Sequence, residues 1–129
     1  MKTFNKEDAT LRERIKEAFK TLRKEGFIAR MDFLCCQSCA GYQIATDAAV
    51  MVKAGKKVNG CVYYHHQDAD SLNQHEPEVL LAFGQIESNE LRTIGMSTGD
   101  VGGHVVTALE AVGCTVEWDG NPGKRILVK

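Results

Sequence analysis

The sequence predicts a single domain of the α/β to α+β class, in which a mixed sheet of about five strands is covered by three helices. The chain has 129 residues and 43% hydrophobic content, which is enough for one domain spanning residues 1–129 to bury a core without disulfides. Segments with helical periodicity alternate with short segments rich in β-branched and aromatic residues. We therefore expect an N-terminal helix over about residues 5–25 and an α/β core over residues 27–129.

The N-terminal helix is predicted from apolar residues that recur every three or four positions and would form one buried stripe. The stripe comprises Leu11, Ile15, Ala18, Phe19 and Leu22. Asn5 is the expected N-cap, and Glu7 and Asp8 suit the first turn of a helix because of its dipole. Gly26 is the residue type that commonly follows a helix end.

A parallel βαβ unit is predicted next. Residues 27–34 alternate apolar and polar side chains as a strand does, residues 39 to about 54 form a helix with Ser38 as N-cap and Gly55 as its end, and residues 61–65 form a second strand. Two strands joined through a helix are most simply parallel, with a right-handed crossover. The loop after the first strand and the end of the second strand then lie at one edge of the sheet, where ligand sites of α/β proteins form.

The rest of the chain is expected to complete the sheet. It comprises an exposed polar loop over residues 67–78, a strand over 79–83, a short strand near 91–94, a helix over about 97–112 and a hairpin of strands 115–118 and 125–128. Cys61 and Cys114 fall at strand starts and are predicted to pack in the core. The glycine-rich residues 99–103 are predicted to permit a tight turn and close packing rather than to bind an anion.

The main candidate site is the stretch Cys35-Cys36-Gln37-Ser38-Cys39, which holds three of the five cysteines. It contains a Cys-X-X-Cys at the expected start of a helix, where backbone N–H groups and the helix dipole favour a thiolate. We expect Cys36 to be the exposed nucleophile or first ligand and Cys39 the resolving thiol or second ligand. His65 or His66 would accept a proton or bind a metal, because the parallel unit brings both to the same edge.

Zinc is the cofactor that this set of side chains would suit, with four-coordinate binding by Cys36, Cys39, one histidine and either Cys35 or Asp68. The alternative metal ligands are Cys35, Cys36, Cys39, His65, His66 and Asp68. The second ligand pair usual in zinc sites, another Cys-X-X-Cys or a His-X3-His, is absent from the sequence. Thiol redox chemistry and metal binding therefore both stay open.

A second hypothesis is a non-catalytic domain that binds a protein partner or a ligand and in which the cysteines are structural. It rests on the fact that no nucleophile with both a base and an orienting group can be identified in the sequence. Whether the chain is an enzyme, and what its substrate or partner is, are left open.

Charge and hydropathy limit the classes of partner that are expected. Sixteen basic residues balance seventeen acidic ones, so the charge of a general nucleic-acid binder is missing. No apolar run approaches the roughly 18 residues needed to span a bilayer, so no membrane association is expected. The charged N-terminus and the cysteine content favour a cytoplasmic protein.

Several short motifs together resemble a family of small bacterial proteins of unknown function. They are Gly26-Phe27-Ile28-Ala29-Arg30, Cys35-Cys36-Gln37-Ser38-Cys39, Tyr64-His65-His66-Gln67-Asp68 and Val116-Glu117-Trp118-Asp119-Gly120 followed by Arg125-Ile126. The resemblance covers most of the chain, from the first strand to the last, and implies no activity.

A looser resemblance is to thioredoxin-like proteins, in which a strand leads into a Cys-X-X-Cys at a helix start. By this resemblance Cys36 and Cys39 would match the redox pair, and Pro77 would match the cis-proline of that family. The sequence departs from the pattern because Leu34 and Cys35 stand where that family has a tryptophan, and because a terminal hairpin follows the last helix.

Overall fold

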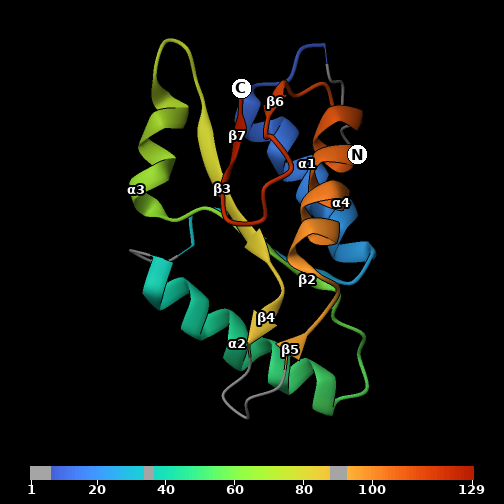
Figure 1. The fold of residues 1–129 in the computed structure, drawn as a ribbon. Helices are drawn as coiled ribbons and strands as arrows, with labels where there is room; N and C mark the ends of the chain where they lie inside the picture. The colour runs from blue at the N-terminus through green and yellow to red at the C-terminus, as the bar shows by residue number, and fades with distance from the viewer. Residues whose placement is uncertain (1–6, 34–36, 88–92) are drawn as a thin grey trace, which may run out of the picture.

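A computed structural model gives the fold of the chain (Figure 1). It describes residues 7–33, 37–87 and 93–129, and for residues 37–41, 66, 67, 87 and 93 it describes the backbone alone. The helices are α1 (Leu11–Lys24), α2 (Gln37–Lys53), the short α3 (His66–Ala69), the 3-10 helix η1 (Asp70–Asn73) and α4 (Thr98–Ala111). The strands are β1 (Phe27–Arg30), β2 (Gly60–Tyr63), β3 (Val79–Gly84), β4 (Ile86–Glu87), β5 (Thr93–Ile94), β6 (Val116–Glu117) and β7 (Ile126–Val128).

The main sheet has five strands in the order β1-β2-β3-β7-β6. β1 and β2 are parallel and are joined through α2, whereas the other neighbouring pairs are antiparallel. β4 and β5 form a separate antiparallel pair that contacts α2. The predicted single domain, with a mixed five-stranded sheet, a parallel unit at one end and a C-terminal hairpin at the other, is confirmed.

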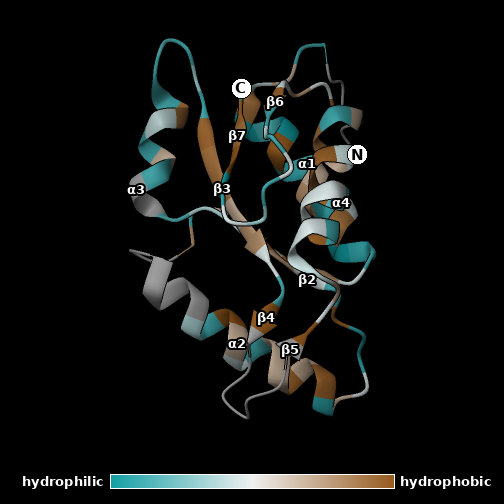
Figure 2. Cartoon of the chain, in the orientation of Figure 1, coloured by the Kyte–Doolittle hydropathy of each residue, from teal (hydrophilic) through white to brown (hydrophobic). Residues whose placement is uncertain are grey.

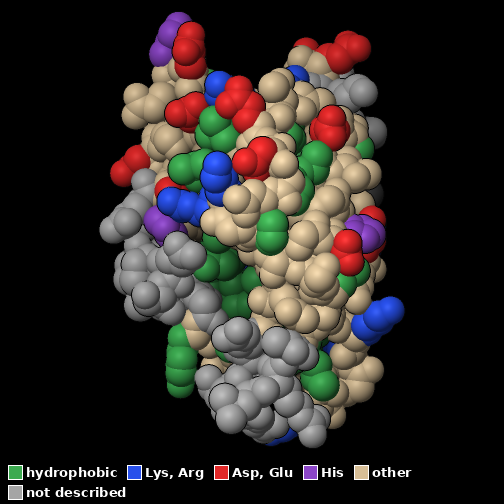
Figure 3. All heavy atoms as spheres, viewed as in Figure 1, with side chains coloured by type: hydrophobic (Ala, Val, Ile, Leu, Met, Phe, Trp, Pro, Cys, Tyr) green, Lys and Arg blue, Asp and Glu red, His purple; other side chains and the backbone are tan. Residues whose placement is uncertain are grey.

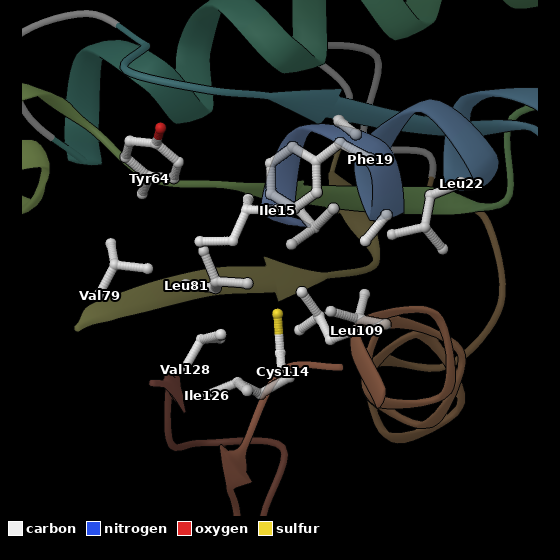
Figure 4. Packing of buried hydrophobic residues seen from close by; sticks show 14 of the residues in the cluster. Ile15, Phe19, Leu22, Tyr64, Val79, Leu81, Leu109, Cys114, Ile126 and Val128 are labelled. Carbon is white, nitrogen blue, oxygen red and sulfur yellow. The ribbon is translucent and has the colours of Figure 1, made fainter. Parts of the chain in front are cut away.

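The larger hydrophobic core lies between the sheet and the pair of helices α1 and α4. Ile15 and Phe19 of α1 and Leu109 of α4 are fully buried there, and Figure 4 shows them turned toward Leu81 of β3. Each such side chain stabilises the fold by about 1.5–3 kcal/mol relative to its exposed state. In Figure 2, β3 and β7 are mostly hydrophobic, in keeping with a core layered on this face.

A smaller core lies on the opposite face of the sheet, under α2. Ala45 and Ala48 of α2 are buried against Ile28 of β1 and Tyr63 of β2. The small side chains allow the helix to lie close to the strands, as predicted. Successive residues of β1 and β2 contribute to the two cores in turn because side chains of a strand alternate between faces.

Helix α1 begins later than predicted, at Leu11 rather than near residue 5. Its N-cap is Thr10, whose Oγ1 accepts a hydrogen bond from the backbone N–H of Glu13 at 3.2 Å. A threonine followed three residues later by a glutamate is the pattern of a capping box. The helix therefore begins after Thr10 and not after the predicted cap, Asn5. Glu7 and Asp8 therefore precede the helix instead of lying in its first turn.

The predicted end of this helix is confirmed, because Gly26 follows it with a φ of 94°, a conformation that favours glycine. Asn5, the predicted cap, lies outside the described residues. Gly55 and Gly113 likewise follow the ends of α2 and α4, as expected from the sequence.

Strand β1 is shorter than the predicted strand over residues 27–34, because it ends at Arg30. Asp32 has a φ of 50°, in the left-handed region, which breaks the extended backbone that a strand needs. The chain therefore turns away from the sheet earlier than predicted, before the cysteine motif.

Residues 67–78 were predicted to be an exposed loop, and this prediction is wrong for their first half. Helices α3 and η1 form there, and Ala69 and Leu72 are buried in the larger core. Two apolar residues among polar neighbours are too weak a periodic signal to predict such short helices. The hydroxyl of Ser71 donates to the backbone oxygen of Asp68 at 2.6 Å and so helps to hold this segment.

In the part of the chain that the structure covers, every helix is too short or too polar to cross a bilayer.

Candidate functional site at the end of the parallel strands

The parallel strands β1 and β2 end side by side at one edge of the sheet, as predicted. Their register pairs Arg30 with Tyr63. Beyond the strands, the N–H of Tyr64 donates to the carbonyl of Arg30 at 3.3 Å, and the N–H of Phe33 donates to the carbonyl of Tyr64 at 2.9 Å. The residues that precede the cysteine motif therefore lie directly beside the residues that precede His65.

His65 is a buried imidazole at this edge, with 6% of its surface exposed. It is the N-cap residue of α3, and its Nε2 lies 3.2 Å from Oδ2 of Asp68 in the same helix. Its other ring nitrogen, Nδ1, is buried and has no hydrogen-bond partner among the described residues. The imidazole thus contacts a carboxylate through one nitrogen, and its other nitrogen has no hydrogen-bond partner among the described residues.

Arg125, which lies in the C-terminal hairpin, contacts the carboxylate of Asp68. Its Nη1 donates to Oδ2 of Asp68 at 2.9 Å, across 57 residues of sequence. Only 17% of the Asp68 side chain is exposed, so the pair is partly shielded from water. Asp68 thus accepts a hydrogen bond from Arg125 and lies 3.2 Å from the His65 ring, so this network of polar contacts connects the residue before β7 with α3.

Arg30 anchors α2 at the same edge. Its Nη2 lies 3.3 Å from Oδ2 of Asp47, and its guanidinium lies 5.6 Å from the centre of the Phe33 ring. Asp47 also accepts a hydrogen bond from the Gln43 amide at 2.9 Å. These contacts connect the end of β1 with α2, the helix that carries the second half of the cysteine motif.

The predicted cysteine cluster is only partly within the described residues. Cys35 and Cys36 lie outside them, and Cys39 is described by its backbone alone, as a residue of α2. That helix begins at Gln37, so Ser38 lies inside it and is not the N-cap that was predicted. A contact between these thiols and His65 therefore stays a prediction.

Of the predicted zinc ligands, the structure brings His65 and Asp68 together, whereas the side chain of His66 is not described. Within the described ranges, no three histidine, cysteine or acidic side chains gather closely enough to hold a metal ion. The carboxylate oxygen of Asp68 nearest His65 is already shared with Arg125, and a cation there would face the guanidinium charge. Asp68 is therefore better suited to orient His65 than to bind a metal itself.

The two remaining cysteines are packing residues, as predicted. Cys61 and Cys114 are free thiols and both are buried. Burial raises the pKa of Cys61 to about 12 and that of Cys114 to about 11. Both thiols stay protonated at neutral pH and are poor nucleophiles, so thiol chemistry would have to come from the cysteine motif.

Arg125 is the site residue that the sequence analysis missed. It lies in the predicted hairpin, but no local pattern connects it with Asp68, because the two meet only through the strand order of the sheet. The contact between His65 and Asp68 is indicated in the sequence only by their His-X-X-Asp spacing, which the structure places at the start of α3.

Charge offers no further guide to a ligand on the face drawn in Figure 3, where acidic and basic side chains are intermixed. A separate open hollow of about 720 Å³ lies between α1 and α4. His104 lines it at 4.0 Å from Glu25, and its ring lies 5.6 Å from that of Phe27. Half of both polar side chains is exposed to solvent, which is typical of a surface ion pair.

The chain belongs to a protein family whose model matches residues 3–129 and is described as a domain of unknown function (DUF6891). No curated protein and no solved structure matches the chain. The resemblance to an uncharacterised family is thus confirmed. The cis-proline implied by the looser thioredoxin resemblance is not found at Pro77, since the described residues include that position and contain no cis peptide bond.

Proposed function

We propose that this member of the DUF6891 family carries out thiol–disulfide exchange at the sheet edge where β1 and β2 end. Cys36 is the nucleophile, Cys39 the resolving thiol and His65 the base. The proposal rests on one observation: the buried Nδ1 of His65 has no partner among the described residues, while Nε2 is held by Asp68.

The contact between Nε2 and Asp68 determines what Nδ1 can do. An ionised carboxylate only accepts hydrogen bonds, so a neutral His65 carries its proton on Nε2, and Nδ1 is an acceptor. A buried acceptor without a donor costs about 1–3 kcal/mol, and such sites in native proteins commonly have a catalytic or binding role. A proton donor is therefore expected beside Nδ1.

The cysteine motif is the nearest source of such a donor in the sequence. Phe33 is hydrogen-bonded to Tyr64, the residue before His65. Cys36 is three residues beyond Phe33, which limits their separation to about 11 Å. A thiol at this position is within reach of the sheet edge, and the start of α2 would favour its thiolate form.

The proposed reaction has two exchange steps. His65 takes the proton of Cys36, the resulting thiolate attacks one sulfur of a substrate disulfide, and the other substrate sulfur leaves as a thiolate that takes up a proton. The thiolate of Cys39 then attacks the sulfur of Cys36 in the mixed disulfide and releases the second substrate thiol. The substrate disulfide is reduced to two thiols, and Cys36 and Cys39 are oxidised to a disulfide.

Zinc binding is a second candidate, because histidines that bind zinc through one nitrogen commonly have a carboxylate beside the other, and Nε2 of His65 lies 3.2 Å from Asp68. In that case Nδ1 would be the ligand, with Cys36, Cys39 and Cys35. Asp68 would then orient the histidine.

An aromatic disulfide reagent that releases a coloured thiolate tests the exchange reaction. The reduced native protein should release two thiolates per chain and form a disulfide between Cys36 and Cys39, identified by peptide mass spectrometry. Cys39→Ser should release one thiolate and keep the reagent attached to Cys36. Cys36→Ser should lose the fast reaction, whereas the adjacent Cys35→Ser should retain it. If Cys36 reacts no faster than a thiol of the unfolded chain, the proposal is wrong.

Elemental analysis of protein purified without a chelator separates the two candidates. About one zinc ion per chain, lost in both Cys36→Ser and Cys39→Ser, would favour the zinc site over the exchange reaction. A fully reactive Cys36 in a zinc-free protein would favour exchange. If the cysteines are unreactive and no metal is bound, the remaining hypothesis is a non-catalytic binding domain in which the cysteines are structural.

A further inference from the structure

We infer that Arg125 is a positioning residue that fixes which nitrogen of His65 carries the proton, acting through Asp68. The inference deepens the proposed function, because a base at Nδ1 requires the proton to be on Nε2. Its geometric basis lies wholly within the described residues and does not depend on where the cysteines lie.

One oxygen of Asp68 contacts both Arg125 and His65. Oδ2 of Asp68 lies 2.9 Å from Nη1 of Arg125 and 3.2 Å from Nε2 of His65. An arginine side chain has only donors, so the oxygen that Nη1 contacts is used as an acceptor. Asp68 is therefore kept as an acceptor, and an acceptor obliges Nε2 of His65 to be the donor.

Arg125 excludes an alternative arrangement of this contact. Without the arginine, the carboxylate could rotate away from Nε2, and the proton of a neutral imidazole could then lie on Nδ1. Nδ1 would become a donor that could not accept a proton from a thiol. One electrostatic contact thus distinguishes a competent imidazole from an incompetent one.

The orientation of the Asp68 carboxylate has to be fixed from outside its own helix. α3 has four residues, and its backbone is tied by the bond from Ser71 to the carbonyl of Asp68. Neither feature sets the rotation of the carboxylate. Arg125 immediately precedes β7, whose Ile126 is fully buried, so the sheet supplies a fixed point for the carboxylate.

Nitrogen NMR of the imidazole tests the inference directly, because protonated and unprotonated ring nitrogens have well-separated signals. In the ¹⁵N-labelled native protein near neutral pH, Nε2 of His65 should be protonated and Nδ1 should not. Arg125→Gln removes the charge and should give a mixture of the two tautomers, with both signals shifted toward each other. Arg125→Lys restores a cation and should return the native pattern.

The matched control is Lys124→Gln, which removes a charge from the neighbouring position. Lys124 pairs with the exposed Asp119 at 3.4 Å and is not part of the contacts among Arg125, Asp68 and His65. This variant should keep the native tautomer and the native reaction rate of Cys36. Arg125→Gln should slow the reaction of Cys36 with the disulfide reagent by about twofold or more, because part of the imidazole population cannot accept its proton.

The outcomes separate this inference from the proposed function. A tautomer change in Arg125→Gln without a change in the Cys36 rate would support the positioning role and contradict His65 as the base. A native tautomer pattern in a folded Arg125→Gln would overturn the positioning role. A native protein whose His65 carries its proton on Nδ1 would overturn it as well, without need of any variant.

Discussion

At the scale of single residues, Tyr64 is a second buried polar group without a partner. It is 1% exposed, its hydroxyl has no hydrogen-bond partner within the described part of the chain, and Figure 4 shows the oxygen pointing away from the aliphatic side chains. Burial raises its pKa above the ordinary value of 10.0, with the charge of Arg12 acting in the opposite direction. The unpaired hydroxyl therefore lowers the stability of the fold, whereas the aromatic ring packs in the core without needing it.

Tyr64→Phe tests this account. Removal of an unpaired buried hydroxyl should leave the free energy of unfolding unchanged or raise it by about 1 kcal/mol, since the aromatic contacts are kept. Urea titration measures the change. A loss of more than about 1 kcal/mol would show that the hydroxyl has a stabilising partner, such as an ordered water.

The buried thiols predict a loss of stability at alkaline pH. Burial raises the pKa of Cys61 from 9.0 to about 12, so the unfolded chain loses this proton first as the pH rises. The stabilisation is complete below about pH 9 and declines until about pH 12, by about 1.4 kcal/mol per pH unit. When the pH rises from about 8 to 10, the free energy of unfolding of the native protein should decrease. In Cys61→Ala this decrease should be smaller by about 1 kcal/mol. An equal loss in both proteins would contradict the assigned burial.

At the scale of elements, two adjacent glycines of α4 should respond oppositely to substitution. A Cβ on Gly102 would lie 2.5 Å from Cη2 of Trp118 and 2.8 Å from Cε2 of Phe83, whose rings pack edge to face. A Cβ on Gly103 would meet nothing within 4 Å. Gly102 thus permits the close packing predicted for residues 99–103.

Gly102→Ala should therefore lower the free energy of unfolding by about 1–3 kcal/mol, because the overpacked rings have to move. Gly103→Ala should raise it by up to about 1 kcal/mol through better helix propensity. Thermal unfolding of the two variants measures the difference. Equal effects would show that Trp118 does not pack against Gly102 of α4.

The elements show what the sequence can and cannot predict. The long helices and the parallel unit follow from periodicity and from glycines such as Gly26, which act locally. The start of α1 was misplaced because Asn5 and Thr10 are both good caps, and side-chain contacts decide between them. The site was predictable as far as His65 and Asp68, which are neighbours in sequence, but Arg125 was not, because its contact depends on strand order.

At the scale of the whole molecule, β7 is an inner strand although it lies near the C-terminus. It pairs with β3 on one side and β6 on the other, and Ile126 and Val128 are fully buried. Nothing in the local pattern of a hairpin tells whether it adds to the edge of a sheet or where, so this order was not predicted. The stability of the whole sheet should depend on this short strand.

Ile126→Ala should lower the free energy of unfolding by about 2–5 kcal/mol, since it removes buried methyl groups and leaves a cavity. Leu127→Ala is the matched control, because Leu127 points to the other face and is partly exposed. It should cost clearly less. Urea titrations that gave the same loss for both would show that β7 does not pack as described.

The late position of β7 in the chain bears on how the protein is made. During synthesis, one edge of β3 remains unpaired until residues 126–128 have left the ribosome exit tunnel, since β7 supplies its partner. Arg125 emerges in the same step and only then can reach Asp68. The nascent chain would therefore lack the contact between Arg125 and Asp68 until β7 has joined the sheet.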